Sequence, residues 1–320
     1  MALNTELLIT LQQLKGFGNK TILNLATSVD LSSIEDLYNY WKSLKGSKYN
    51  NVTKEDLASA NRAANRILEA CDIEGIGIIS YFESSFPSIL KSCVNEDGKM
   101  DPPIVLYYRG DLHALERPAV AVIGTREPTP NGEDAGIFFA REFAQKGYNI
   151  VSGLALGCDS TGHQGALAVG GITTAFLANS LKWDDIYPKE NLKLAKAIVD
   201  NGGLLLSEYH MGQKCGRYAF IARDRLQAGL SNATIVIQTG VNGGTMHAVN
   251  ATLQAGKPLF AVKYNFPSDY YHKKVQGNIK MIDDGRAYPL SRTTIEECLE
   301  LVEKNIWKRN NYHQQQLIFS

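Results

Sequence analysis

The stretch VAVIGTREPTPNG, from Val120 to Gly132, decides the fold class. A run of β-branched apolar residues ends in a glycine turn and enters a helical pattern, as a strand does when it leads into a helix. The stretches NIVSGLALGCDSTGHQGA from Asn149 and TIVIQTGVNGGTMHAVNA from Thr234 repeat this arrangement. Because alternating strands and helices form parallel sheets, we expect the three turns along one edge of a single sheet.

This sheet edge is the predicted binding site. The first N–H groups of each helix have no acceptor within the helix, and they carry the positive end of its dipole. Several helix N-termini on one edge therefore suit a ligand that bears phosphate groups.

The sequence pattern divides the chain into three parts. Residues 1–72 read as helices, and the glycine turn Lys15–Lys20 is typical of a helix-hairpin-helix or SAM-like domain. Such a turn can present N–H groups to a DNA phosphate or serve only in packing, and both interpretations stay open. Residues 73–292 predict an α/β fold with a doubly wound, mostly parallel sheet. Residues 293–320 predict a C-terminal helix at Ile295–Lys304 and a polar tail.

The periodicity also predicts individual elements of the sheet domain. Two short strands are expected near 77–81 and 104–108. Further strands are expected near 120–124, 148–152, 172–178, 203–207, 234–238 and 258–262. Helices are expected near 132–146, 160–169, 190–201, 222–230 and 245–255.

Composition narrows the class of protein. The 320 residues are 44% apolar, and 33 basic residues balance 33 acidic ones, so any nucleic-acid contact has to come from a local basic patch. The start of the chain lacks a basic leader, and no apolar run reaches the roughly 18 residues of a membrane span. We therefore expect a cytoplasmic protein. The five cysteines are scattered without C-x-x-C spacing, which predicts reduced thiols and no metal site. We also expect no cofactor.

Arg126 is the first candidate contact for a phosphate. It follows Gly124 and Thr125 at the predicted end of a central strand. A guanidinium at this point projects over the crevice and can hold a phosphate with two hydrogen bonds. Pairing with a surface carboxylate is an equal alternative.

The glycine turn that starts at Ser152 and Gly153 is the second candidate. Its glycines permit a close approach of the backbone to an anion, and Asp159 is expected to cap the following helix. His163 lies one turn further along, but no serine, cysteine and carboxylate set is spaced to activate it as a base. We therefore expect His163 to orient the loop, and we predict no catalytic residue.

The densest basic cluster of the sheet domain has four members: Lys214, Arg217, Arg223 and Arg225. Arg223 and Arg225 do not share a helical face, so one is expected to reach the crevice while the other pairs with a carboxylate such as Asp224 or Glu208. A solvated run of charges is the alternative. We favour the functional interpretation because the cluster precedes an apolar helix and lies beside a predicted strand end.

A third glycine turn, Thr239–Thr245, ends the strand near 234–238. Consecutive glycines and a threonine hydroxyl at a helix N-terminus form a nest for phosphate. The full set of candidate phosphate contacts is Gly124, Thr125, Arg126, Ser152, Gly153, His163, Lys214, Arg217, Arg223, Arg225, Asn242, Gly243, Gly244, Thr245, Lys263 and Asn278.

These motifs, in this order, resemble the DprA/Smf family of DNA-processing proteins. The resemblance rests on VAVIGTR, VSGLALGCDSTGHQGAL, GGLLLSEY, FIARDRLQAGLS, GGT and GNIKMIDDG, and it covers nearly all of residues 5–290. It implies an extended Rossmann-like protein that binds single-stranded DNA, forms a homodimer and helps to load a RecA-type recombinase in transformation. It also implies that Arg126, Arg223, Arg225 and the glycine turns are the phosphate contacts.

The chain departs from the family pattern at several positions. Leu156 stands where an arginine is usual, Asp224 replaces an asparagine, and Lys263-Tyr264 replaces Pro-Gly. Asn242-Gly243-Gly244 replaces Ser-Gly-Ser, and we expect no winged-helix domain within residues 293–320. Each lost phosphate contact lowers a salt-dependent affinity. A role outside transformation, in phage defence or beside a toxin partner, is therefore a second implication of the resemblance.

Three hypotheses about function follow. The leading one is a non-enzymatic protein that holds the backbone of a single DNA strand. The second is a nucleotide sensor, because related Rossmann-like sheets bind or cleave nucleotides at this edge. Hydrolysis is disfavoured, since Met246-His247-Ala248 follows Thr245 where a nucleotide-cleaving enzyme needs a glutamate. The third is an antitoxin-type partner in a protein complex.

Overall fold

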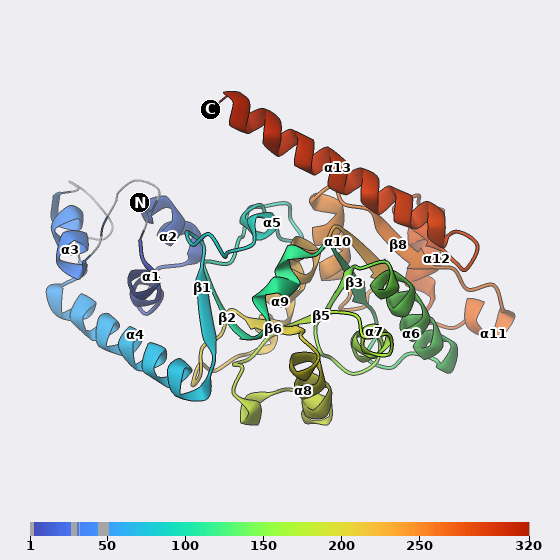
Figure 1. The fold of residues 1–320 in the computed structure, drawn as a ribbon, viewed down its shortest axis with the longest axis horizontal. Helices are drawn as coiled ribbons and strands as arrows, with labels where there is room; N and C mark the ends of the chain where they lie inside the picture. The colour runs from blue at the N-terminus through green and yellow to red at the C-terminus, as the bar shows by residue number, and fades with distance from the viewer. Residues whose placement is uncertain (1–2, 27–30, 32, 44–50, 320) are drawn as a thin grey trace.

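The structure, a computed structural model, describes residues 3–26, 31, 33–43 and 51–319, with side chains as far as Arg309. Its centre is a nine-stranded sheet in the order β1-β2-β6-β5-β4-β3-β7-β8-β9 (Figure 1). The strands are β1 Gly77–Ser80, β2 Val105–Gly110, β3 Ala119–Ile123, β4 Asn149–Ser152, β5 Thr173–Leu177, β6 Leu204–Ser207, β7 Ala233–Val236, β8 Leu259–Val262 and β9 Tyr288–Leu290.

Strands β3 to β9 run parallel to one another, whereas β2 is antiparallel to both of its neighbours, β1 and β6. The predicted mostly parallel α/β sheet is therefore confirmed. The strand order reverses at β3, which pairs with β4 on one side and with β7 on the other. Ligands of doubly wound sheets bind at such a reversal, beyond the carboxyl ends of the strands.

The α-helices fall before, between and after the strands. They are α1 Thr5–Gln12, α2 Asn19–Ala26, α3 Ile34–Ser43, α4 Lys54–Glu74, α5 Ser88–Lys91, α6 Pro130–Gln145, α7 Cys158–Leu167, α8 Leu192–Asp200, α9 Arg217–Leu230, α10 Met246–Gln254, α11 Pro267–Tyr270, α12 Gln276–Asp283 and α13 Ile295–Phe319. Short 3₁₀ turns are η1 Leu112–Glu116, η2 Trp183–Asp185 and η3 Lys189–Asn191.

Alternate residues of β3 face opposite helical layers. Val120 and Val122 share a buried cluster with Phe143 of α6. Ala121 and Ile123 belong to a separate cluster that contains residues of α10 and α12. Since successive strand residues point to opposite faces, helices cover both sides of the sheet and only its edges remain open for a site.

The N-terminal helices α1–α4 lie beside β1, at one end of the sheet (Figure 1). Leu8 of α1 and Ile67 of α4 share one buried cluster with Tyr107 and Leu205 of the sheet. The helices therefore pack against the sheet domain through a common apolar core. A domain boundary near residue 72 stays a prediction.

Three elements differ from the expected ranges. Helix α9 begins at Arg217, five residues before the expected range, because the charged and aromatic first turn hides the apolar periodicity. The sequence does not predict strand β9, because it has only three residues and contains Pro289. Proline is tolerated there because β9 is the outermost strand of the sheet. Helix α13 continues past the expected end at Lys304 because no glycine or proline interrupts residues 293–320.

Two further observations bear on the class of protein. All five cysteines are free thiols, and four of them are buried. Among the described residues, no helix is both long enough and apolar enough to cross a membrane.

Candidate nucleic-acid interface

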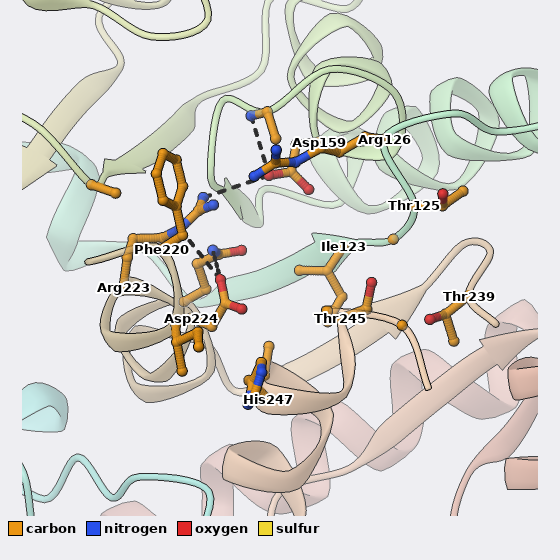
Figure 2. Close-up of a pocket in the computed structure, with 18 of the residues that line it drawn as sticks. Ile123, Thr125, Arg126, Asp159, Phe220, Arg223, Asp224, Thr239, Thr245 and His247 are labelled. Atoms are coloured by element: carbon orange, nitrogen blue, oxygen red, sulfur yellow. Dashed lines mark hydrogen bonds and ion pairs between the residues drawn. The ribbon is translucent and has the colours of Figure 1, made fainter. Parts of the chain in front are cut away.

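A cavity of about 900 Å³ opens beyond the carboxyl ends of β3 and β7, where the strand order reverses (Figure 2). The loops after β3, β4, β5 and β7 line it, together with residues of α9 between Arg217 and Gln227 and the start of α10. Its volume falls within the range of about 300–1,000 Å³ that is usual for small-molecule sites. The predicted sheet edge therefore does carry a cavity.

Backbone contacts fix the loop that carries Arg126. The Thr125 amide donates to the Gln238 carbonyl over 2.7 Å, and the Cys158 amide donates to the Thr125 carbonyl over 3.1 Å. A Cβ atom on Gly124 would lie 2.5 Å from Cys158 Sγ, so only glycine allows this approach. The Arg126 backbone is thus held firmly at the cavity rim.

The Arg126 side chain is exposed, and its guanidinium lies 5.4 Å from the centre of the Phe220 ring. Within the part of the chain that the structure describes, no carboxylate is within ion-pair distance of it. Of the two interpretations of Arg126, the geometry thus favours a cation available to a ligand. The Phe220 face also limits the directions in which the guanidinium can point.

Arg223 also lines the cavity, but its charge is already balanced. It is 5% exposed and lies 3.6 Å from an Asp159 oxygen and 3.3 Å from an Asp224 oxygen (Figure 2). It further donates to the Phe176 carbonyl over 3.3 Å. A guanidinium between two buried carboxylates adds little net positive charge to the cavity.

The two carboxylates respond to this burial. Desolvation raises the pKa of Asp224 to about 6. The Arg223 guanidinium opposes this increase, whereas the nearby Asp159 charge adds to it. Burial likewise raises the pKa of Asp159 against the effect of Arg223. At neutral pH the cavity wall therefore contains Asp224 mainly as an anion, which a proton can neutralise slightly below neutrality.

Asp159 occupies the glycine turn after β4. Its Oδ2 accepts the amide hydrogens of Gly153 over 3.1 Å and of Ala155 over 3.3 Å. The expectation that Asp159 caps α7 is corrected, because the helix cap is Gly157 and the carboxylate faces backward into the loop. This turn therefore binds the Asp159 carboxylate of the protein itself and not the phosphate of a ligand.

Arg225 lies beneath the cavity rather than in it. Its two terminal nitrogens bind Glu208 over 2.7 and 2.8 Å, and its Nε lies 2.7 Å from an Asp101 carboxylate oxygen. With 5% of its surface exposed, it has no free donor face for a phosphate. The sequence correctly allowed one arginine to pair with Glu208, but a phosphate contact by Arg225 is corrected to an internal ion pair.

The same ion pair touches the N-terminal helices. Asn19, the first residue of α2, donates to the Pro102 carbonyl over 3.3 Å and to Glu208 over 3.5 Å. The glycine turn before α2 therefore packs against the sheet domain. DNA contact by this turn stays a prediction.

The loop after β7 keeps free backbone donors. Asn278 accepts the Thr239 amide over 2.9 Å and so anchors the start of the loop. No acceptor within the described residues takes the amide hydrogens of Gly244 and Thr245, which directly precede α10. A helix N-terminus with unpaired N–H groups attracts phosphate.

Three expected contacts are buried side chains that support the site from below. Ser152 donates to the Val122 carbonyl over 2.6 Å, and Asn278 donates to the ends of β7 and β8. His163 is fully buried and lies 2.7 Å from the Thr173 hydroxyl. Burial, with the Arg223 charge, lowers the pKa of His163 to about 3, so the ring is neutral. The expectation of direct ligand contact is therefore corrected for these three side chains.

The structure brings half of the expected residues to the cavity. Those that line it are Gly124, Thr125, Arg126, Arg217, Arg223, Gly243, Gly244 and Thr245. Gly153 lines a small side pocket next to it. Outside the lining, the exposed residues are Lys214, Asn242 and Lys263.

Several lining residues were missed from the sequence: Asn179, Tyr187, Asp224, Thr239 and His247. Tyr187 stands in the irregular segment between β5 and α8, where no turn motif draws attention to it. Its ring lies 5.9 Å from that of Phe220. Asp224 carried a signal, since it departs from the asparagine of the resembled family.

No three His, Cys, Asp or Glu side chains are grouped as metal ligands among the residues that the structure describes. The expectation of a site without metal stays a prediction.

Comparison with known proteins decides the family. A family model described as DNA recombination-mediator protein A matches residues 77–303. The chain belongs to the DprA family. DNA processing protein DprA of Bacillus subtilis is 33% identical over 242 residues, which are 75% of this chain and 76% of that protein. Protein Smf of Escherichia coli is 35% identical over 162 residues, and the match spans 43% of its length.

Two solved structures from the DprA family resemble this one. DprA of Streptococcus pneumoniae matches with a TM-score of 0.71 at 24% identity, over 91% of this chain and 95% of that chain. DprA of Helicobacter pylori, described for its single-stranded DNA binding mode, matches with a TM-score of 0.58 at 32% identity. That match covers 70% of this chain and 96% of the H. pylori chain. The DprA fold thus extends over the N-terminal helices as well as the sheet.

Proposed function

We propose that this chain binds the backbone of single-stranded DNA at the cavity and acts in DNA processing without catalysing a reaction. The observation that carries the proposal is that two sets of donors line one cavity: the exposed Arg126 guanidinium, and the amides of Gly244 and Thr245. Among the described residues, Arg126 has no carboxylate within ion-pair distance and the two amides have no acceptor. Both features present hydrogen-bond donors and positive charge to the same space. The relative from H. pylori, described for its binding of single-stranded DNA, supports this choice of ligand.

Single strands suit this geometry better than duplexes. Guanidinium groups and backbone amides contact phosphates rather than base edges, so the base sequence is expected to matter little. Phe220 and Tyr187 at the rim offer ring faces on which any base can stack. A cavity at strand ends accepts one flexible backbone more readily than a rigid double helix.

The environment of the titratable groups supports a binding role over catalysis. His163 is buried and neutral, and both Asp159 and Asp224 lie against the Arg223 guanidinium. A general base needs to reach the ligand with a suitable pKa. Of the carboxylates on the cavity wall, Asp224 comes nearest to this description, but its carboxylate lies 3.3 Å from the Arg223 guanidinium.

We place the activity in the cytoplasm, in transformation, where a homodimer passes the bound strand to a RecA-type recombinase. A setting in phage defence, with a toxin as partner, is the alternative. The departures from the family pattern at Leu156 and Asp224 support that alternative, because both reduce the positive charge near the cavity.

A small nucleotide is the second candidate ligand. The cavity volume of about 900 Å³ and the paired rings of Tyr187 and Phe220 favour it. One nucleotide would fit inside such a space without any strand outside it.

Fluorescence anisotropy with a labelled oligothymidylate separates these proposals. We expect tight binding of the single strand, weaker binding of a duplex of equal length, and an affinity that falls steeply with salt. Nucleoside monophosphates are added as competitors and screened for thermal stabilisation. Stabilisation by a mononucleotide together with no binding of the oligonucleotide would favour the sensor instead.

A further inference from the structure

The loop after β8 exposes an unusual group of aromatic rings. Phe266 is 71% exposed, Tyr270 43% and Tyr271 80%, and all three lie in or next to the short helix α11. The two tyrosine rings stand edge to face with centres 5.3 Å apart. Neighbouring large aromatic side chains left in water mark an interaction surface more often than chance exposure does.

Positive charge borders these rings. Lys263 and Lys273 are exposed, and no carboxylate of the described residues lies within ion-pair distance of either. The acidic residue of α11, Asp269, is buried and accepts a hydrogen bond of 2.6 Å from Asn131. The surface that faces water is therefore aromatic and basic.

Several contacts join this loop to the cavity wall. Lys274 Nζ donates to the Glu127 carbonyl and lies 3.3 Å from the Glu127 carboxylate, in the loop that carries Arg126. The Gly277 amide donates over 2.9 Å to the Thr239 carbonyl, in the loop that lines the cavity. Figure 1 shows α11 at the end of the sheet opposite to the N-terminal helices. A strand that leaves the cavity over the β7 loop would meet the β8 loop next.

We propose that Phe266, Tyr270, Tyr271, Lys263 and Lys273 form a second nucleic-acid contact, the β8 aromatic platform, on which bases of the emerging single strand stack. This inference rests on the proposed function of the cavity and extends its track. Exposed rings bind successive bases without regard to sequence, and the two lysines neutralise the phosphates between them. The two lysines without a carboxylate partner among the described residues favour a polyanionic strand as the occupant, and association with a second copy of the chain is an outcome of the test below.

A length series of labelled oligothymidylates, extended one nucleotide at a time, tests the platform. In the wild type, affinity is expected to rise once when the cavity fills and again when the strand reaches α11. Tyr271→Ala and Phe266→Ala are expected to keep the first rise in affinity. Their affinity for the longest oligonucleotides is expected to fall by about fivefold or more, the effect of one lost stacking contact. Tyr288→Ala is the matched control, because this tyrosine is 51% exposed at the start of β9, away from the carboxyl ends of the strands.

The outcomes separate the platform from the cavity. Arg126→Ala is expected to weaken the binding of short and long strands alike. If this variant binds short strands as the wild type does, the result counts against the cavity site and not against the platform. If Tyr271→Ala and Phe266→Ala bind every length as the wild type does, the platform is wrong. The platform proposal is also wrong if the two variants bind DNA normally but have a different molecular mass by light scattering. The surface then joins two copies of the chain.

Photo-crosslinking locates the contact directly. Oligonucleotides that carry one 5-iodouracil at successive positions are expected to crosslink first to residues around Phe220 and then, further along, to the peptide that contains Tyr270 and Tyr271. Crosslinks restricted to the cavity at every position would overturn the proposal.

Discussion

Arg225 and Glu208 form a two-pronged ion pair beneath the cavity, with nitrogen–oxygen distances of 2.7 and 2.8 Å. Asp101 closes the group on the other side of the guanidinium, 2.7 Å from Nε. The three conspicuous arginines of the sequence thus have three different environments. Arg126 is exposed, Arg223 sits between two carboxylates on the cavity wall, and Arg225 stabilises the fold.

Arg225→Ala is expected to lower the free energy of unfolding by about 3–5 kcal/mol, because it leaves Glu208 and Asp101 without their buried counter-charge. Urea denaturation followed by circular dichroism measures this change. Arg225→Lys is not expected to restore stability, since an ammonium cannot match both carboxylate oxygens. Arg117→Ala is the control, an exposed arginine just before β3 at the opposite sheet edge. A stable Arg225→Ala protein with reduced DNA affinity would contradict the assignment.

Asp224 is expected to make DNA affinity depend on pH. Its pKa of about 6 reflects burial, so a falling pH protonates it and removes a negative charge from the cavity wall. Affinity should therefore rise as pH falls from about 8 through about 6. Asp224→Asn should bind more tightly than the wild type at the higher pH and lose this part of the pH dependence. An identical pH profile in the two proteins would refute the role of Asp224.

The same substitution should change stability with a definite sign. The folded-state pKa of Asp224 lies above its ordinary value of 3.8, so the folded protein holds the proton more tightly than the unfolded chain does. The contribution of Asp224 to stability is then fully present below about pH 4 and is lost as pH rises through about 6. Asp224→Asn is expected to unfold at a higher temperature than the wild type at pH 8 and to show a smaller difference at pH 4.

Gly153→Ala is expected to disrupt the cavity wall. A Cβ atom there would lie 1.1 Å from Arg223 Nη1 and 2.7 Å from an Asp159 oxygen, so the buried ion pair has to move. Overpacking of this kind costs about 1–3 kcal/mol of stability. Thermal unfolding measures it, with Gly216→Ala as the control, because a Cβ atom at Gly216 meets nothing within 4 Å. Equal unfolding temperatures for both variants would show that Arg223 is not held as described.

The sheet and its binding edge could be predicted because their signals are local. The β-branched run at Val120 and the glycine turn behind it fix a strand, a turn and a helix within a few residues. The exposure of Arg126 could be inferred in the same way, from its place just after a strand.

The roles of buried polar residues could not be predicted, because their partners are distant in the sequence. Asp101 is 124 residues away from Arg225, and Asn278 bonds to carbonyls of β7 and β8 that only the sheet brings together. The position of Asp159 near the start of a helix predicts that it caps that helix. The Asp159 carboxylate turns back into the loop because Arg223 and the loop amides of Gly153 and Ala155 hold it there.

The most direct test of the central claim measures how much Arg126 contributes to DNA affinity. The affinity for a labelled oligothymidylate is determined by anisotropy at several salt concentrations for the wild type, Arg126→Ala and the control Arg117→Ala. If the cavity holds the DNA backbone, Arg126→Ala weakens binding by about 1–3 kcal/mol, lowers the salt slope by roughly 0.7, and leaves the unfolding temperature unchanged. Wild-type affinity and slope in a folded Arg126→Ala protein would contradict the account and move the nucleotide or protein-partner hypotheses ahead of it.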